Sequence, residues 1–208
     1  MSESAWLRRA RRLHALAATG LYFSDDEFDR ERYQEIADIA LAMLADVGGL
    51  PIEQVVGLFA ESNAGYSTPQ VDVRGAVIEG DQILLVREKR DGRWTMPGGF
   101  ADVGYSGAEN AAKEIEEEAG VHVSVSRLYA ARHKAQHAYA PDVRDFYKLF
   151  YLCERADGQM PSAGLETSEV DFFTLAQLPE LSSGRVIRED IELAFAMAAD
   201  PTLVTVFD

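Results

Sequence analysis

The sequence places three glutamates, Glu114, Glu117 and Glu118, at positions i, i+3 and i+4. If this stretch is helical, the three side chains lie on one face and span about 6 Å along the helix axis. Carboxylates that close repel one another unless a cation lies among them, and hard oxygen ligands suit Mg²⁺ or Mn²⁺. The same spacing also occurs in a solvated acidic helix face, and the helix alone does not decide between the two.

A glycine-rich turn precedes the three acids. Pro97, Gly98 and Gly99 come before the expected helix, and glycine allows the backbone to approach a ligand closely. The helix also carries an apolar stripe that can pack on a sheet, formed by Ala108, Ala111, Ile115 and Ala119. A turn that admits a ligand, followed by acids on a packed helix, favours a metal site over a solvated face.

Residues 94–121 resemble the Nudix box, written G-x5-E-x7-R-E-U-x-E-E-x-G-U with U apolar. Gly99 takes the opening glycine, and the E-x-x-E-E of the pattern is intact. The sequence departs from the pattern twice, because Tyr105 stands where it has Glu and Lys113 where it has Arg. In the family that Glu mainly braces the turn between loop and helix, so Tyr105 bears on loop geometry more than on catalysis. Lys113 keeps the positive charge but lacks the planar fork of arginine.

The resemblance implies hydrolysis of a nucleoside diphosphate linked to another moiety, X, with water as the nucleophile. A divalent cation, Mg²⁺ with Mn²⁺ as the alternative, would neutralise phosphate oxygens and lower the pKa of the water. By resemblance its main ligands are Glu114 and Glu118, with Glu117 sharing the cluster. The backbone carbonyl of Gly98 or Gly99 would add a further ligand.

The general base stays open at the level of sequence. In the family it is either a box glutamate, here Glu117, or an acid in a later loop. The segment 164–169 offers Glu166 and Glu169, and we favour Glu166 because Glu169 begins an expected strand. Either acid could equally be an ordinary surface residue.

Phosphate groups require positively charged partners in a protein this acidic. Arg74, Arg87 and Lys148 lie on expected strands next to the box helix. We select Arg87 and Lys148 as substrate-binding residues, together with the backbone of Gly98 and Gly99. Each cation taken alone is more often a surface charge.

The composition excludes several classes of protein. The chain of 208 residues carries a formal charge of −15, which repels a nucleic-acid backbone, so we expect no nucleic-acid partner. Its single cysteine, Cys153, cannot form an intramolecular disulfide. No apolar run reaches the ~18 residues that cross a bilayer. We therefore expect a cytoplasmic protein without a membrane partner.

Residues 1–66 have helical periodicity and form the expected N-terminal domain. The first helix is expected to stop at Gly20, and the second to begin with Ser24 as its N-cap and Glu27 completing a capping box. The second helix is expected to end at residues 48–49, both glycine. Its apolar residues are expected to point inward, namely Tyr33, Ile36, Ile39, Ala40, Met43 and Leu44.

Residues 63–69, with the sequence NAGYSTP, have the composition of a linker, and the period of a strand replaces that of a helix from residue 70. Residues 67–208 then combine expected strands with the box helix and a final helix at 187–198. This order predicts an α+β domain with a mixed sheet flanked by helices. The α/β/α sandwich that the Nudix resemblance implies fits the same order.

A closer resemblance extends over almost the whole chain. The stretches WLRRARRLHALAATGLYFSDDEFDRERYQEI and VDVRGAVIEGDQILLVREKRDGRWTMPGGFADVGYS are similar to a bacterial Nudix subgroup with a helical N-terminal domain. Its members act on CDP-choline or on UDP-linked and related nucleoside diphosphates, and they are homodimers, so we expect the helical domain to dimerise. ADP-ribose pyrophosphatase activity is an alternative, because it shares the box. A non-catalytic Nudix ligand sensor is another, against which the intact acids count.

Overall fold

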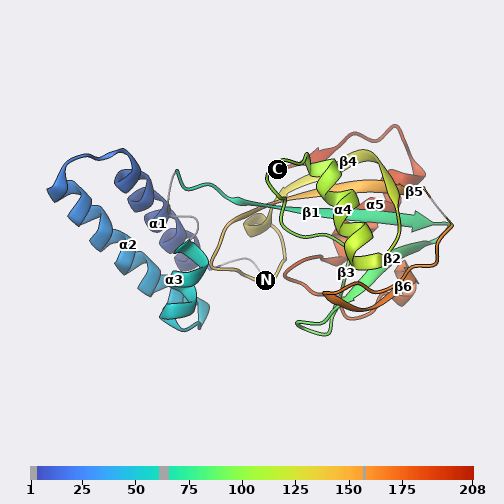
Figure 1. The fold of residues 1–208 in the computed structure, drawn as a ribbon, viewed down its shortest axis with the longest axis horizontal. Coiled ribbons are helices and arrows are strands. Elements are labelled where there is room, and N and C mark those ends of the chain that lie inside the picture. Colours follow the sequence, from blue (N-terminus) through green and yellow to red (C-terminus); the bar gives the residue numbers. More distant parts are fainter. Residues whose placement is uncertain (1–3, 61–65, 157) are drawn as a thin grey trace. The chain divides into compact units, whose positions relative to one another are not determined.

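The computed structural model describes residues 4–60, 66–156 and 158–208, which fall into two compact units (Figure 1). The first comprises the chain up to Gln70 together with residues 140–146, and the second comprises residues 71–139 and 147–208. Part of the linker expected at residues 63–69 lies outside the described residues. No helix in the described ranges is both long and apolar enough to cross a membrane.

The first unit is helical. It contains α1 (Ala5–Phe23), α2 (Glu27–Gly48) and α3 (Ile52–Ala60). Its core is formed by buried side chains of all three helices and one from the segment 140–146, namely Leu7, Ala10, Leu41, Leu44, Ala45, Val55 and Val143. Nη1 of Arg11 donates hydrogen bonds to the carbonyls of Asp142 and Arg144, at 3.0 and 2.9 Å. A late segment of the chain thus completes the N-terminal core.

The expectation that α1 stops at Gly20 was wrong, because the helix continues to Phe23. A Cβ at position 20 would lie 2.6 Å from the ring of Tyr33 on α2. The glycine therefore allows two helices to approach closely, which is a packing role that looks like a stop signal in the sequence.

The start of α2 was also predicted wrongly. Asp26 is the N-cap, with its carboxylate accepting a hydrogen bond from the Asp29 N–H at 2.9 Å, whereas Ser24 ends α1. Both residues are good caps, and the longer α1 leaves only Asp26 in position. The expected end of α2 was confirmed, since Gly49 adopts the left-handed conformation with φ 62°.

The face of α2 that packs inward is offset from the expected one. Ala40 and Leu44 are buried as expected, but their buried neighbours are Ala37, Leu41 and Ala45. The expected core residues Ile36 and Ile39 are exposed in the single chain, Ile39 to 54%. Part of the apolar surface of the helix is therefore left uncovered within one copy of the protein.

The second unit is built on a mixed sheet. Its strands are β1 (Gln70–Glu79), β2 (Gln82–Glu88), β3 (Trp94–Thr95), β4 (Val123–His133), β5 (Phe146–Arg155), β6 (Thr167–Thr174) and β7 (Val206–Phe207). The order is β3-β2-β1-β5-β4-β7, with β6 paired antiparallel to β2. The short β7 pairs parallel to β4 and was not expected from the sequence.

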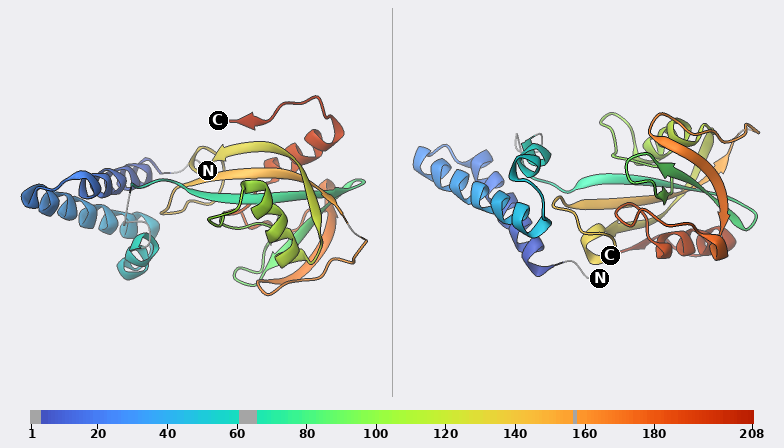
Figure 2. Two further views of the ribbon diagram at one scale, coloured as in Figure 1. Left: turned by 45° about the horizontal axis from the view of Figure 1, so that its top comes forward. Right: turned by 90° about the horizontal axis from the view of Figure 1, so that it is seen from below.

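Two helices, α4 (Gly107–Ala119) and α5 (Arg188–Ala199), cover opposite faces of this sheet (Figure 2). On α4, Ala111, Ile115 and Ala119 pack on one core cluster with residues of β1 and β2. On α5, Ile191 and Ala194 pack on the other. The predicted α+β class and Nudix-type α/β/α arrangement with a helical N-terminal domain were confirmed.

Local signals fix the two ends of α4. Ser106 caps the helix in a capping box with Glu109, and Gly120 ends it with φ 66°. The acids at positions 114, 117 and 118 therefore lie in the last two turns of a well-defined helix packed on the sheet.

Candidate active site

The glycine turn runs along the edge of β1. The N–H of Val73 donates to the Gly99 carbonyl at 2.9 Å, and the N–H of Gly75 donates to the Pro97 carbonyl at 3.0 Å. Gly98 has φ +147°, and a Cβ there would collide with the carbonyl of Val73. Only glycine fits this position, and the close approach brings the turn against the last turns of α4.

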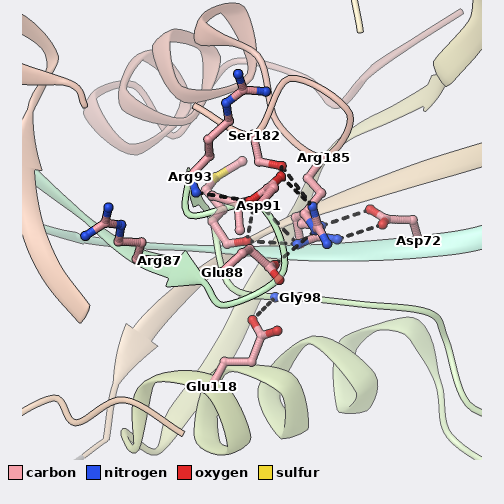
Figure 3. A network of polar contacts seen from close by, with 12 residues as sticks. Asp72, Arg87, Glu88, Asp91, Arg93, Gly98, Glu118, Ser182 and Arg185 are labelled. Carbon is pink, nitrogen blue, oxygen red and sulfur yellow. Dashed lines mark hydrogen bonds and ion pairs between the residues drawn. The ribbon is translucent and has the colours of Figure 1, made fainter. Parts of the chain in front are cut away.

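Glu118 is the most buried of the three box acids, with 6% of its surface exposed. Its Oε2 accepts a hydrogen bond from the N–H of Gly98 at 2.9 Å (Figure 3). Burial raises the pKa of Glu118 to about 7, and the nearby charges of Glu88 and Glu114 act in the same direction. The positive charge of Arg74 and the Gly98 N–H oppose this shift without cancelling it.

Glu114 lies against the same turn and is half-buried. A Cβ on Gly99 would come within 2.9 Å of its carboxylate. Burial raises the pKa of Glu114, and the charges of Glu117 and Glu166 raise it further. Glu114, Glu118 and the two glycines are thus brought together as predicted from their spacing.

Glu117 is more exposed than this pair. Its carboxylate is exposed and lies 3.6 Å from the ammonium of Lys113. No group of three or more His, Cys, Asp or Glu side chains is arranged to hold a metal ion within the described residues. The donor chemistry nevertheless fits a divalent cation, because Glu114 and Glu118 are oxygen ligands whose charges are disfavoured by burial and by each other.

The loop before β6 is attached to the end of α4. Thr167 donates from Oγ1 to the Glu118 carbonyl at 2.7 Å, and the N–H of Gly164 donates to the same carbonyl at 3.2 Å. The exposed Glu166 in this loop raises the pKa of both Glu114 and Glu88, so its charge lies within electrostatic reach of both acids. Glu166 is thus a neighbouring charge of this acid group, without a direct contact to Glu114 or Glu118 among those that the described residues show.

Glu169 and Arg87 partner each other instead. Arg87 donates from Nη1 to Oε1 of Glu169 at 2.6 Å and from Nε to the Gly92 carbonyl at 2.8 Å. Figure 3 shows the Arg87 side chain pointing away from Gly98 and Glu118.

Lys148 forms an ion pair with the buried carboxylate of Asp72. Only 1% of its surface is exposed, and its Nζ lies 2.6 Å from Oδ1 of Asp72. Burial lowers the pKa of Lys148 to about 8, although the charge of Asp72 favours the protonated form.

Asp72 was missed by the sequence reasoning, and with it the role of Arg74. Nε and Nη2 of Arg74 donate to the two oxygens of Asp72 at 3.0 and 2.8 Å, and Nη1 donates to the Met96 carbonyl at 3.1 Å. Arg74 thus holds the backbone immediately before the glycine turn. Asp72 and Arg74 share one strand face, and two opposite charges at i and i+2 on a buried strand were the available signal.

Glu88 was also missed. It is buried at the end of β2, where burial raises its pKa, and Nε of Arg185 lies 3.0 Å from its Oε1. Arg185 also contacts Oδ2 of Asp91 at 3.1 Å (Figure 3). An acid in phase with the buried Leu84 and Val86 was the sequence signal.

Comparison with known proteins places this site in a family. A UDP-X-like, N-terminal oligomerisation domain matches residues 4–59, and a NUDIX domain matches residues 68–191. A Bacillus subtilis (strain 168) protein, provisionally named ADP-ribose pyrophosphatase YjhB, is 42% identical over 206 residues. The alignment covers 99% of this chain and 98% of that protein.

Solved structures agree with these matches. The crystal structure of a UDP-X diphosphatase is 35% identical with a TM-score of 0.63, and both chains are covered completely. An ADP-ribose pyrophosphatase from Streptococcus suis 89-1591 is 37% identical with a TM-score of 0.61, over 68% of this chain and 100% of that chain. The chain therefore belongs to the Nudix hydrolase family. Within it, the protein is a pyrophosphohydrolase that carries the UDP-X-like N-terminal domain.

Proposed function

We propose that this enzyme hydrolyses nucleoside diphosphates of the UDP-X type, CDP-choline among them, to a nucleoside monophosphate and phospho-X. The observation that carries the proposal is the likeness to a UDP-X diphosphatase over the full length of both chains. The N-terminal match supports it, because residues 4–59 fit a UDP-X-like domain rather than a general Nudix one.

Mg²⁺, or Mn²⁺ in its place, would be held by Glu114 and Glu118, with Glu117 and the carbonyl of Gly98 or Gly99 as further ligands. When bound, the cation neutralises phosphate oxygens and makes the attacking water more acidic. Since the Gly99 carbonyl already accepts from Val73, we favour the carbonyl of Gly98. Glu117 would have to leave Lys113 to join the set.

The chain's own groups orient the reaction. The Gly98 N–H fixes the Glu118 carboxylate, and the backbone of Gly98 and Gly99 would lie against the diphosphate. Glu166 is our choice as the base that takes a proton from water, because its loop is bonded to α4 through Thr167. Glu117 is the alternative base, since it is exposed next to Glu118.

Arg87 and Lys148 remain the candidates for binding phosphate. Each would have to exchange its present carboxylate, Glu169 or Asp72, for a phosphate oxygen. Arg87 is the more accessible of the two, but its side chain would also have to turn toward Gly98 and Glu118. Lys148 is buried and would have to give up its contact with Asp72.

ADP-ribose is the second candidate substrate. The Bacillus subtilis relative and the Streptococcus suis structure both carry ADP-ribose pyrophosphatase in their names. ADP-ribose contains the same diphosphate bond, so the acid site would act on it in the same way and only the contacts to base and sugar would differ.

The experiment is a substrate panel with CDP-choline, UDP-glucose, ADP-ribose and a dinucleoside polyphosphate, assayed with Mg²⁺ and with Mn²⁺. Phosphate released by a coupled phosphatase gives kcat/KM, and the Glu118→Gln protein measures the background. We expect a UDP-X or CDP-choline value at least about tenfold above that for ADP-ribose, or 1.4 kcal/mol of transition-state discrimination. The reverse order would transfer the assignment to ADP-ribose, and no turnover would overturn both.

We also propose that the helical unit forms a homodimer. The description of the matching domain names oligomerisation, and α1 and α2 leave Leu16, Ile36 and Ile39 exposed in the single chain. Light scattering should give twice the mass of one chain. Ile39→Glu should yield monomers, whereas Gln54→Glu, which adds the same charge at an exposed polar position, should not. A monomeric parent protein would contradict the proposal.

A further inference from the structure

The two positions at which this chain departs from the Nudix pattern contact each other. Tyr105 lies at the end of the loop that follows the glycine turn, and Lys113 lies on α4. The Lys113 ammonium is 5.9 Å from the centre of the Tyr105 ring. A cation at that distance is attracted to the ring face by its quadrupole. The two departures from the pattern therefore meet at one place between the loop and α4.

Lys113 also joins the loop to the acids. Its Nζ lies 2.8 Å from Oδ2 of Asp102 in the loop and 3.6 Å from Oε1 of Glu117 on the helix. One ammonium group thus contacts the loop at Asp102 and Tyr105 and a box acid at Glu117. A carboxylate at position 105 would compete with both acids for this charge, whereas an aromatic ring attracts the ammonium without neutralising it.

A buried amide completes the attachment of the loop. Asn110, 1% exposed, accepts a hydrogen bond from the Asp102 N–H at 2.9 Å. It also donates to the carbonyls of Asp102 and Ser106, at 3.3 and 3.2 Å. The Asp102 N–H is consequently a local reporter, because it exchanges with solvent only when the loop leaves α4.

We infer that Tyr105 and Lys113 form a positioning pair at the two positions where the box pattern has Glu and Arg. The pair holds residues 99–106 against α4 and leaves the Lys113 charge available to Asp102 and Glu117. The inference rests on the proposed function only in its last step, which is that the position of this loop sets the cation affinity of the box acids. The attachment of the loop itself is independent of substrate and metal.

A double-mutant cycle tests the attachment. Tyr105→Ala, Lys113→Met and the double variant are compared by hydrogen exchange of the Asp102 amide, without metal or substrate. Each single variant should exchange several-fold faster, and the double variant no faster than the quicker single variant. Tyr105→Phe, which keeps the ring, and Val103→Ala, a change at a fully exposed neighbour, should exchange like the parent. Additive effects, or no effect of Tyr105→Ala, would overturn the pair.

Direct Mn²⁺ titration tests the last step. Tyr105→Ala changes no charge, so a weaker Mn²⁺ affinity would report loop position and not electrostatics. We expect the dissociation constant to rise several-fold while the melting temperature hardly changes, since both side chains are on the surface. Unchanged affinity despite faster Asp102 exchange would remove the coupling to the acids.

Restoring the residues of the pattern gives an independent check. The double variant Tyr105→Glu with Lys113→Arg should keep both the slow Asp102 exchange and the parent Mn²⁺ affinity, because an ion pair replaces the ring contact. Exchange as fast as in Tyr105→Ala would contradict the inference. If exchange behaves as expected but no panel substrate is hydrolysed, the proposed function fails and the positioning pair stands.

Discussion

Asp72 and Glu118 are both buried and both interact with the charge of Arg74, but their pKa values are shifted in opposite directions. Asp72 receives a two-pronged contact from Arg74 and a second cation, Lys148. Burial alone would raise the pKa of Asp72, but the two cations hold it well below its usual range. Glu118 receives a direct hydrogen bond from the Gly98 N–H, and burial raises its pKa to about 7.

The difference separates an acid whose charge is balanced inside the fold from the acid that we propose as a metal ligand. Asp72 is fully compensated, so its charge is part of the packed interior. Glu118 is buried beside Glu114, and the charge of Arg74 offsets the cost of burial only in part, so a bound cation would relieve it. Burial by itself would not have distinguished the two.

The largest expected effect is a loss of kcat/KM on substitution of Glu118. Glu118→Gln should lower kcat/KM by at least about 100-fold, because several kcal/mol of transition-state stabilisation depend on the cation held there. Thermal unfolding should occur at or above the parent temperature, since a costly buried charge has been removed. Activity within a few-fold of the parent would show that Glu118 is not a metal ligand.

The next prediction concerns the free energy of unfolding and is tested at Asp72. Asp72→Asn leaves Arg74 and Lys148 buried without their carboxylate and should cost about 3–5 kcal/mol of unfolding free energy. Urea unfolding of the sheet unit measures this loss, and kcat per folded molecule should fall far less than in Glu118→Gln. A loss of less than about 1 kcal/mol would mean that Asp72 does not carry the compensation assigned to it.

His14 is a third buried group, and it is kept neutral. It packs against Phe59 with ring centres 4.5 Å apart, and burial lowers its pKa. As the pH falls, His14 takes up a proton near pH 6.5 in the unfolded chain and only at a lower pH in the folded chain. The contribution of neutral His14 to stability is therefore complete above pH 6.5 and is lost as the pH falls toward the pKa of the folded state. His14→Phe should remove this part of the pH dependence, measured as the difference in melting temperature between the two proteins. Parallel pH profiles would contradict the assignment.

The smallest effect is expected at the exposed ion pair. Arg87 and Glu169 contact at 2.6 Å, but their side chains are 41% and 54% exposed. Glu169→Gln should therefore change the unfolding free energy by no more than about 1 kcal/mol. A larger loss in urea unfolding would show that the contact does more than its exposure suggests.

The sequence was sufficient for α4 and its surroundings because their signals are local. Ser106 and Gly120 flank the helix directly, the apolar stripe lies within it, and the acids follow from spacing along it. Gly20 misled because the residue that explains it, Tyr33, lies on another helix. The strand β7 could not be foreseen, since its two residues are ordered by pairing with Ala130 and Ala131 far back in the chain.

For the site, the spacing placed Glu114 and Glu118 next to each other, and Glu166 was chosen from its place before a strand. The roles of these residues stay predictions. The partners of the chosen cations were not found, because Lys148 meets Asp72 across 76 positions of sequence. Glu117 has the right spacing, yet its side chain pairs with Lys113, and side-chain direction cannot be read from helical phase alone.

The place of the segment 140–146 in the helical unit limits how the protein can be engineered. It belongs to the helical unit although it lies between β4 and β5, and Val143 and the carbonyls bound by Arg11 are contributed from there. The helical unit is therefore not a cassette that can be exchanged by cutting the chain near residue 70. A chimaera that borrows another N-terminal domain must import the matching seven-residue segment as well.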